Sequence, residues 1–300
     1  MDVDINILNV SFYNQTQAEW SLGLLLSCLR GFIPRITLIF NADGCWCRCT
    51  TSALSLSLFM QKRDFFQDYI IDHTQGHCVL LHLLTHELDL ILNDGSTTST
   101  QRNTTDICRL VLRKNDTSHV WIEKSGTSSY TRSCIQLCEE HGPYASGDLI
   151  PPQTLTPLSS DAEISSSGCY IAPKDLIRTI RNHKAQTLSL THMMDGGISI
   201  HSEHNGNTKE TELRGSGIEN RFNPTDQPGI KSLFLSGVLL ATLRCVQNTP
   251  ASRFRIDRVT ENETNGPQPL ALMAALGHNS YIRFFLPDNR QAFSTKATQK

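Results

Sequence analysis

Three cysteines stand at every second position in the segment GCWCRCT, residues 44–50. Side chains of a strand alternate between its two faces, so Cys45, Cys47 and Cys49 would all point the same way. Three sulfurs on one face could bind one metal ion or take part in redox chemistry. They could equally form the small apolar face of an ordinary strand, because free cysteine packs like a small hydrophobic residue.

The metal interpretation needs a fourth ligand, because a structural zinc site normally has four. The nearest histidines along the chain are His73, His77 and His82, and nothing in their spacing singles one out. We therefore favour the apolar strand face and predict neither a metal site nor a cofactor.

The composition limits what the rest of the chain can do. Its 300 residues suffice for about two domains, and 39% hydrophobic residues provide enough apolar side chains for real cores. A net charge of −2 means that any nucleic-acid contact must come from a local basic patch. The acidic start lacks the basic region of a signal peptide, and the longest apolar run is too short to span a membrane. We expect an intracellular protein with reduced thiols.

Enzyme motifs are missing from the sequence. It contains no G-x-x-x-x-G-K-[ST] loop, no G-x-G-x-x-G, no H-E-x-x-H and no G-x-S-x-G. An enzyme with an unrecognised acid–base pair stays open as an alternative of a different class, with nothing in the sequence to support it.

Two segments about half a chain length apart repeat the same pattern. Residues 36–46, ITLIFNADGCW, and 188–198, LSLTHMMDGGI, each read as an apolar strand, an Asp-Gly turn and a second strand. Asp-Gly between strands is a strong hairpin signal. The same shift relates 82–92 to 234–244, both predicted helices, and brings 128–137 close to the last predicted strand.

The repeat predicts a duplicated α+β domain, each copy with two helices and several antiparallel strands. We place an N-terminal domain at 1–138, a Pro- and Ser-rich connector at 139–168, and a C-terminal domain at 169–288. The remaining residues, 289–300, are expected to be a disordered tail.

The helix predicted at 172–184, APKDLIRTIRNHK, has two distinct stripes. Leu176, Ile177 and Ile180 form the stripe to be buried. The opposite stripe and its surroundings carry the cations Lys174, Arg178, Arg181 and Lys184, and the second predicted helix adds Arg244. Taken alone this is an ordinary solvated face, although such a row is all that contact with phosphate backbones requires.

The order of these elements resembles the sliding clamps of the PCNA type, and most closely the Hus-type subunit of the heterotrimeric nine-one-one checkpoint clamp. The resemblance covers nearly the whole chain. It is carried by KRDFFQDYIID (62–72), VLLHLLTHELDLIL (79–92), GCYIAPKDLIRTIRNHKAQTLSLTHMMDGGISI (168–200) and GHNSYIRFFLP (277–287).

The resemblance implies an α+β fold of duplicated DNA-clamp domains, with antiparallel sheets outside and two helices per domain lining a central hole. It implies a non-enzymatic subunit of a heterotrimeric ring that encircles duplex DNA without sequence preference. The other ring subunits, an AAA+ clamp loader and duplex DNA would be its partners. Its place would be the nucleus, in DNA-damage checkpoint signalling and repair, and a cytoplasmic pool is allowed.

Ring subunits of this family join through the edge strands of their sheets. The resemblance places these edges near HVWIEK, 119–124, and KETEL, 209–213. The expected interface residues are Val120, Ile122, Glu210 and Glu212. Two alternatives with the same fold stay open: a homotrimeric replication clamp and a viral polymerase processivity factor.

Overall fold

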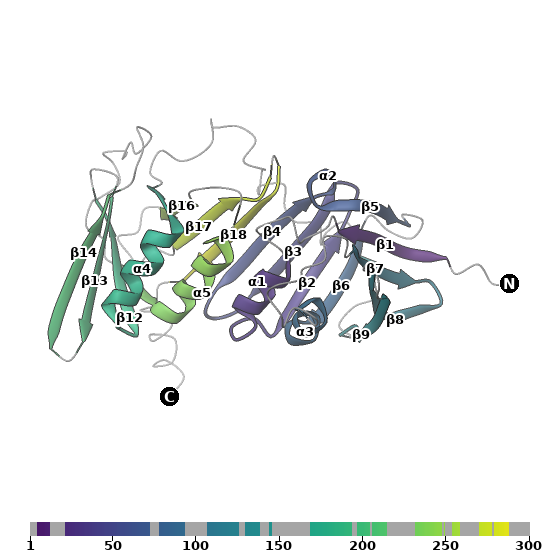
Figure 1. Ribbon diagram of the computed structural model, residues 1–300, viewed down its shortest axis with the longest axis horizontal. Helices are drawn as coiled ribbons and strands as arrows, with labels where there is room; N and C mark the ends of the chain where they lie inside the picture. The colour runs from purple at the N-terminus through teal and green to yellow at the C-terminus, as the bar shows by residue number, and fades with distance from the viewer. Residues whose placement is uncertain are drawn as a thin grey trace. The chain divides into compact units, whose positions relative to one another are not determined.

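The computed structural model divides the chain into two compact units (Figure 1). The first comprises Met1–Cys49, Ser57–Pro157 and Leu276–Tyr281, and the second comprises Thr50–Leu56, Leu158–Ala275 and Ile282–Lys300. The structure describes residues 5–12, 22–72, 78–93, 107–125, 130–138, 144–145, 169–193, 197–204, 206–214, 232–247, 249, 254–258, 270–277 and 279–287.

Five helices lie within the described residues. They are α1 (Leu22–Leu29), α2 (Lys62–Phe65), α3 (Thr85–Asn93), α4 (Pro173–His183) and α5 (Ser236–Gln247). In the first unit α1 packs against α3, and in the second unit α4 packs against α5. In Figure 1 each pair lies side by side.

Two sets of antiparallel strands build the first unit. One is a five-stranded sheet in the order β5 (Phe66–Ile71), β1 (Asn6–Phe12), β7 (Ile107–Arg113), β8 (Asp116–Ser125) and β9 (Tyr130–Gln136). The other runs in the order β10 (Tyr144–Ala145), β6 (Cys78–Leu84), β2 (Arg35–Phe40), β3 (Gly44–Thr50) and β4 (Ser55–Gln61).

The second unit also contains two sets of strands. A four-stranded sheet runs in the order β14 (Asn207–Leu213), β13 (Ile198–His204), β12 (Thr187–His192) and β15 (Ser232–Leu235). The other set runs in the order β18 (Tyr281–Leu286), β17 (Leu270–Ala275), β16 (Phe254–Arg258) and β11 (Cys169–Ile171).

Strand pairing follows the same scheme in each unit. The predicted hairpin is β2–β3 in the first unit and β12–β13 in the second. The first hairpin strand pairs on its other side with the strand before the last helix, β6 or β15. The first strand of each unit pairs with the strand that follows that helix, β1 with β7 and β11 with β16.

Alternation of apolar side chains explains the cores of these sheets. On β1, Leu8, Val10 and Phe12 share one face and are at most 1% exposed. The Phe12 ring lies 4.8 Å from the ring of Phe66 on β5, and Phe66 contacts Phe40 of β2 at 6.3 Å. These rings join the two strand sets of the first unit over a common core.

The predicted helices at 82–92 and 234–244 both begin later than expected. Residues 82–84 belong to β6, in register with β2, and residues 234–235 belong to β15, in register with β12. Short leucine-rich runs fit a buried strand as well as a helix, and the pairing partner decides between them.

The predicted connector and tail fall largely outside the described residues. Of 139–168 only β10 is described, and of 289–300 nothing is described. The predicted domain boundaries therefore stay a prediction. The two compact units differ from the predicted domains mainly at residues 50–56 and 276–281.

Asp89 of α3 holds the helix pair of the first unit together. Its carboxylate is 2% exposed and accepts hydrogen bonds from Ser27 Oγ of α1 at 2.7 Å and Asn93 Nδ2 at 2.6 Å. Arg30, just after α1, forms an ion pair with the second carboxylate oxygen at 3.1 Å. Asn93 also donates to the carbonyl of Gly23 at 3.1 Å, where a larger residue would collide with the Asn93 side chain.

We predict that Asp89→Asn lowers the free energy of unfolding of the first unit by about 2 kcal/mol, because buried donors lose a charged acceptor. Urea unfolding measured by circular dichroism tests this. Glu87→Gln removes the same charge from the same helix and should change stability by less than about 0.5 kcal/mol. Equal losses in both variants would contradict the role of Asp89.

Candidate nucleic-acid interface

Helix α4 presents the predicted basic stripe, and its ends are set by local sequence. Pro173 occupies the first turn, where a missing N–H costs nothing, and Ala172 before it is extended. The helix ends where Lys184 adopts a left-handed conformation, with φ of 52°. Leu176, Ile177 and Ile180 are at most 5% exposed, as the apolar stripe predicts.

All five predicted DNA-binding cations are exposed: Lys174, Arg178, Arg181, Lys184 and Arg244. Arg178 lies 3.4 Å from the Asp175 carboxylate, but both side chains are more than half exposed, so the pair is weak. Lys174 and Arg181 form no ion pair with any described residue. The structure therefore leaves a row of largely uncompensated positive charge along one face of α4.

Helix α5 packs directly against α4 and carries one more exposed cation. Its Val238, Leu239 and Leu243 are buried, whereas Arg244 is exposed. The described part of α5 carries no acidic residue. Within the second unit, the helix pair thus has basic and neutral side chains on its solvent side, with Asp175 as its one acid.

His183, at the end of α4, anchors that helix to the four-stranded sheet. The imidazole is 4% exposed, and its two nitrogens lie 2.6 Å from Ser202 Oγ on β13 and 3.0 Å from Thr211 Oγ1 on β14. Burial lowers the pKa of His183, and the nearby charges of Lys209 and His201 lower it further. The neutral ring therefore fits this place.

Lys209 extends the basic row from a different element. Its ammonium group donates to the carbonyl of Asn182 at 2.9 Å, at the carboxyl end of α4 where a positive charge is favourable. Neither Lys209 nor His183 was predicted as part of this site, since neither belongs to the basic stripe of α4. Lys209 reaches the end of α4 only because the pairing of β14 with β13 places it there, and this pairing cannot be read from the sequence of α4.

The described helices of the first unit carry no equivalent basic row. Arg30 is 61% exposed, but its charge is matched by the buried Asp89 carboxylate. Helix α3 also carries Glu87 in its first turn. The helix pairs of the two units therefore differ in the sign of the charge they present.

The predicted edge at 119–124 is wrong. Strand β8 pairs with β7 on one side and with β9 on the other, so β9 is the outer strand of this sheet. Val120 and Ile122 are at most 1% exposed and face the core of the first unit. The resemblance placed the edge one strand too early, and the alternating apolar side chains of β8 show only that one of its faces is buried.

The predicted edge at 209–213 coincides with β14, which is the outer strand of the four-stranded sheet. Glu210 and Glu212 are both exposed. Glu210 accepts a hydrogen bond from Ser199 Oγ at 2.6 Å, whereas Glu212 has no described partner. Their role between subunits stays a prediction.

The cysteine segment forms β3, and the interpretation as an apolar strand face is confirmed. Cys45 and Cys47 are fully buried, and burial raises the pKa of both thiols. Burial also raises the pKa of the half-buried Cys49 to about 11. His82 lies in register with Thr37, which places it on the other face of the sheet, and its Nδ1 contacts Thr37 Oγ1 at 3.0 Å. Raised pKa values make these thiols poor nucleophiles and poor metal ligands.

Two further properties concern the described residues only. No three His, Cys, Asp or Glu side chains in this part of the chain gather closely enough to hold a metal ion. None of its helices is long and apolar enough to cross a membrane.

Comparison with known proteins identifies the fold. No protein-family model matches the chain, and no curated protein sequence matches it. Among solved structures, it is similar to the Proliferating Cellular Nuclear Antigen of Entamoeba histolytica, with a TM-score of 0.64 and 10% sequence identity. The match covers 94% of this chain and 99% of that one. The chain therefore has the fold of a PCNA-type sliding clamp.

The pKa of His183 generates a prediction about pH. Its folded-state pKa lies below the unfolded value, so the unfolded chain takes up the proton first as pH falls. Stability should therefore be full above about pH 6.5 and decline as pH falls below it. His183→Gln should flatten this decline in urea unfolding between about pH 7.5 and 5.5.

A different histidine, His204 on strand β13, provides the control. His204 is exposed, and His204→Gln makes the same side-chain change outside the contact of His183 with Ser202 and Thr211. If His183→Gln retains the full decline, other groups cause it and the anchoring histidine is not held neutral.

Proposed function

We propose that the chain is a non-enzymatic subunit of a DNA sliding clamp, built from two duplicated clamp domains whose helices line a hole around duplex DNA. The observation that carries this proposal is the exposed basic face of α4 and α5 in a chain with the clamp fold. A row of Lys and Arg without base-reading groups suits contact with phosphates of any sequence.

The shared pairing scheme of the two units supports the duplication. Each has a hairpin, two helices that pack together, and a first strand that pairs with the strand after the last helix. Ring closure would then join outer strands of neighbouring subunits. The outer strands β9 and β14 are suited to this, and β9 takes the place we had expected of 119–124.

We further propose that the ring is heterotrimeric, of the checkpoint type, and acts in the nucleus in DNA-damage signalling and repair. The lack of net positive charge on the described helix pair of the first unit favours this over a homotrimer. Three copies of this chain would place three neutral or acidic helix pairs around the DNA, because Asp89 matches Arg30 and Glu87 is unmatched by a described cation. Different partner subunits can supply the missing charge, and an AAA+ loader would open the ring.

The DNA-contacting role predicts a change in salt dependence. In the ring co-purified with the tagged full chain, Arg178→Gln with Arg181→Gln should reduce the slope of log affinity against log salt by about 0.9 per lost contact. Fluorescence anisotropy with a labelled duplex at several salt concentrations measures this slope.

Removal of two exposed cations elsewhere controls for net charge. Arg63 and Lys114 lie outside helices α1, α3, α4 and α5. The variant with both changed to Gln should keep the parent ring's slope of log affinity against log salt. Equal slopes in the two double variants would contradict α4 as the DNA-contacting face.

The proposed ring also predicts a solution mass. The full chain purified alone should have a mass near 33.5 kDa, and the tagged complex from its own cells should contain three different clamp subunits in equal amounts. Light scattering and native mass spectrometry test both statements. A trimer formed by the chain alone would favour a homotrimeric replication clamp.

Charge reversal at the outer strand tests the interface. Glu212→Lys on β14 should weaken assembly about tenfold, since a like charge opposite a partner strand is costly. Glu203→Lys, on the neighbouring strand β13, makes the same change away from the edge and should have little effect. Equal effects of the two variants would argue against β14 as the interface strand.

A further inference from the structure

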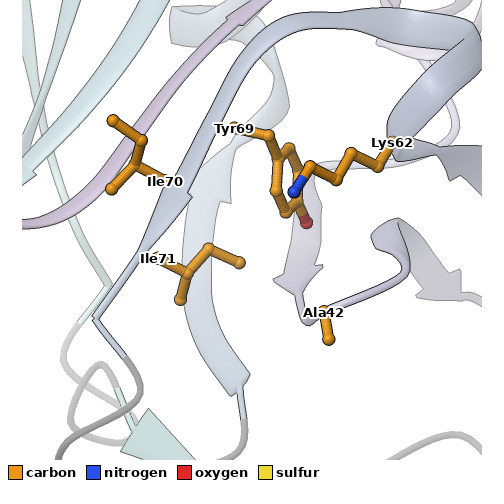
Figure 2. Close-up of a pocket in the computed structure, with 5 residues that line it drawn as sticks. All are labelled: Ala42, Lys62, Tyr69, Ile70 and Ile71. Atoms are coloured by element: carbon orange, nitrogen blue, oxygen red, sulfur yellow. The ribbon is translucent and has the colours of Figure 1, made fainter.

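The five-stranded sheet of the first unit has a second outer strand, β5, at the end opposite β9. Beside β5 lies a hollow of about 300 Å³, drawn in Figure 2. Its walls come from three elements: the strand itself, the turn between β2 and β3, and helix α2. The lining residues are Ala42, Lys62, Tyr69, Ile70 and Ile71.

The main-chain groups of β5 that face away from β1 can be assigned from the register. Asp72 donates to the carbonyl of Ile7, and Asn9 lies opposite Ile70. Hydrogen-bonded pairs alternate in an antiparallel ladder, so Ile70 bonds to β1, whereas Tyr69 and Ile71 direct their N–H and C=O outward. No described residue bonds to these outward groups.

One wall of the hollow is held rigidly. The Tyr69 hydroxyl lies between the carbonyl oxygens of Asn41 in the β2–β3 turn, at 2.9 Å, and of Gly44 at the start of β3. The Asn41 side chain in turn accepts from the backbone N–H groups of Asp43 and Gly44, at 3.0 and 3.1 Å. A preformed wall lowers the ordering cost of binding.

The hollow combines apolar surface with one positive charge. Ile71 is half-buried, and Ile70, on the other face of the strand, is 58% exposed. The Lys62 ammonium lies 5.3 Å from the centre of the Tyr69 ring and forms no ion pair with a described residue. In Figure 2 the Lys62 side chain extends across the Tyr69 ring, while Ile71 lies on the other side of that ring.

We propose that β5 binds an extended peptide segment of a partner protein, which adds to the sheet as an antiparallel strand. Its N–H and C=O groups pair with those of Tyr69 and Ile71, and alternate side chains enter the hollow. An aliphatic residue lies opposite Ile71. Two residues later, opposite Tyr69, an acidic residue meets Lys62.

The direction of the added strand fixes the order of these residues. Because β5 runs from Tyr69 to Ile71, an antiparallel peptide reads aliphatic, any residue, acidic from its N-terminus. An aliphatic middle residue contacts Ile70 on the other face. The register shift between Ser11 and Phe12 of β1 interrupts the β1–β5 ladder before Tyr69 and confines pairing with the peptide to the end of β5 near Ile71.

This proposal does not depend on the DNA-contacting role of α4.

The first test uses the full chain and a fluorescein-labelled peptide, Gly-Ser-Ile-Val-Glu-Ser-Gly, in fluorescence anisotropy. N-methylation of the Ile or Glu amide should weaken binding about tenfold, because these amides face β5. N-methylation of the Val amide, which faces away, should change affinity less than about twofold. The peptide with Ile and Glu exchanged should bind more weakly than the parent peptide.

The second test exchanges charges across the hollow. Lys62→Glu should weaken binding of the Glu peptide two- to fivefold and strengthen binding of the matching Lys peptide by a similar factor. Arg63→Glu makes the same change at the next position of α2, outside the hollow, and should alter neither affinity by more than about twofold. Both side chains are exposed, so neither variant threatens folding.

Three results would overturn the proposal. They are the absence of binding up to about 1 mM peptide, equal effects of N-methylation at all three amides, and equal effects of Lys62→Glu and Arg63→Glu. Slowed hydrogen exchange at the Tyr69 and Ile71 amides upon peptide addition would support strand pairing directly.

Discussion

An open sheet leaves unpaired N–H and C=O groups on each of its two outer strands, and this constraint governs how the chain can interact. In the first unit the outer strands of the five-stranded sheet are β5 and β9, and in the second unit β14 is an outer strand. Unpaired edges invite association unless something blocks them. A ring that uses β9 and β14 would satisfy two edges and leave β5 for a different partner.

The helices face a different constraint, since each must bury one side without burying an unmatched charge. The two units meet it differently. In the first, the buried Asp89 accepts hydrogen bonds from Ser27 and Asn93, and its charge is matched by Arg30. In the second, a neutral His183 makes the buried contact to Ser202 and Thr211. The buried Asp89 carboxylate is paired with Arg30 and so neutralises the charge of that cation. The buried imidazole of His183 is neutral and needs no ion pair, so the cations of α4 remain exposed.

The sequence predicted elements whose signals are local. The hairpin at β2–β3 followed from Asp43-Gly44, and α4 followed from Pro173 and the two stripes around Leu176. The face of β3 followed from a period of two. Such features depend on neighbouring residues along the chain, so periodicity and turn chemistry were sufficient.

Features that depend on pairing could not be predicted in the same way. Whether β8 or β9 is an outer strand depends on which strands lie beside it, and this is settled by pairing between distant parts of the chain. The burial of Asp89 on α3 was not predicted, although Asn93 four residues later was a usable signal of a local hydrogen bond. His183 belonged to neither stripe that we considered, and its role appears only when β13 and β14 are placed against α4.

The location of the β5 hollow decides whether a peptide bound there would compete with association through β9. Strands β5 and β9 are separated by β1, β7 and β8, so a peptide added at β5 does not compete for the backbone groups of β9. Both additions extend the same sheet and require no change in its existing pairs. Closure of the proposed ring through β9 and β14 would therefore be compatible with a peptide on β5, since the two associations use separate hydrogen-bonding groups.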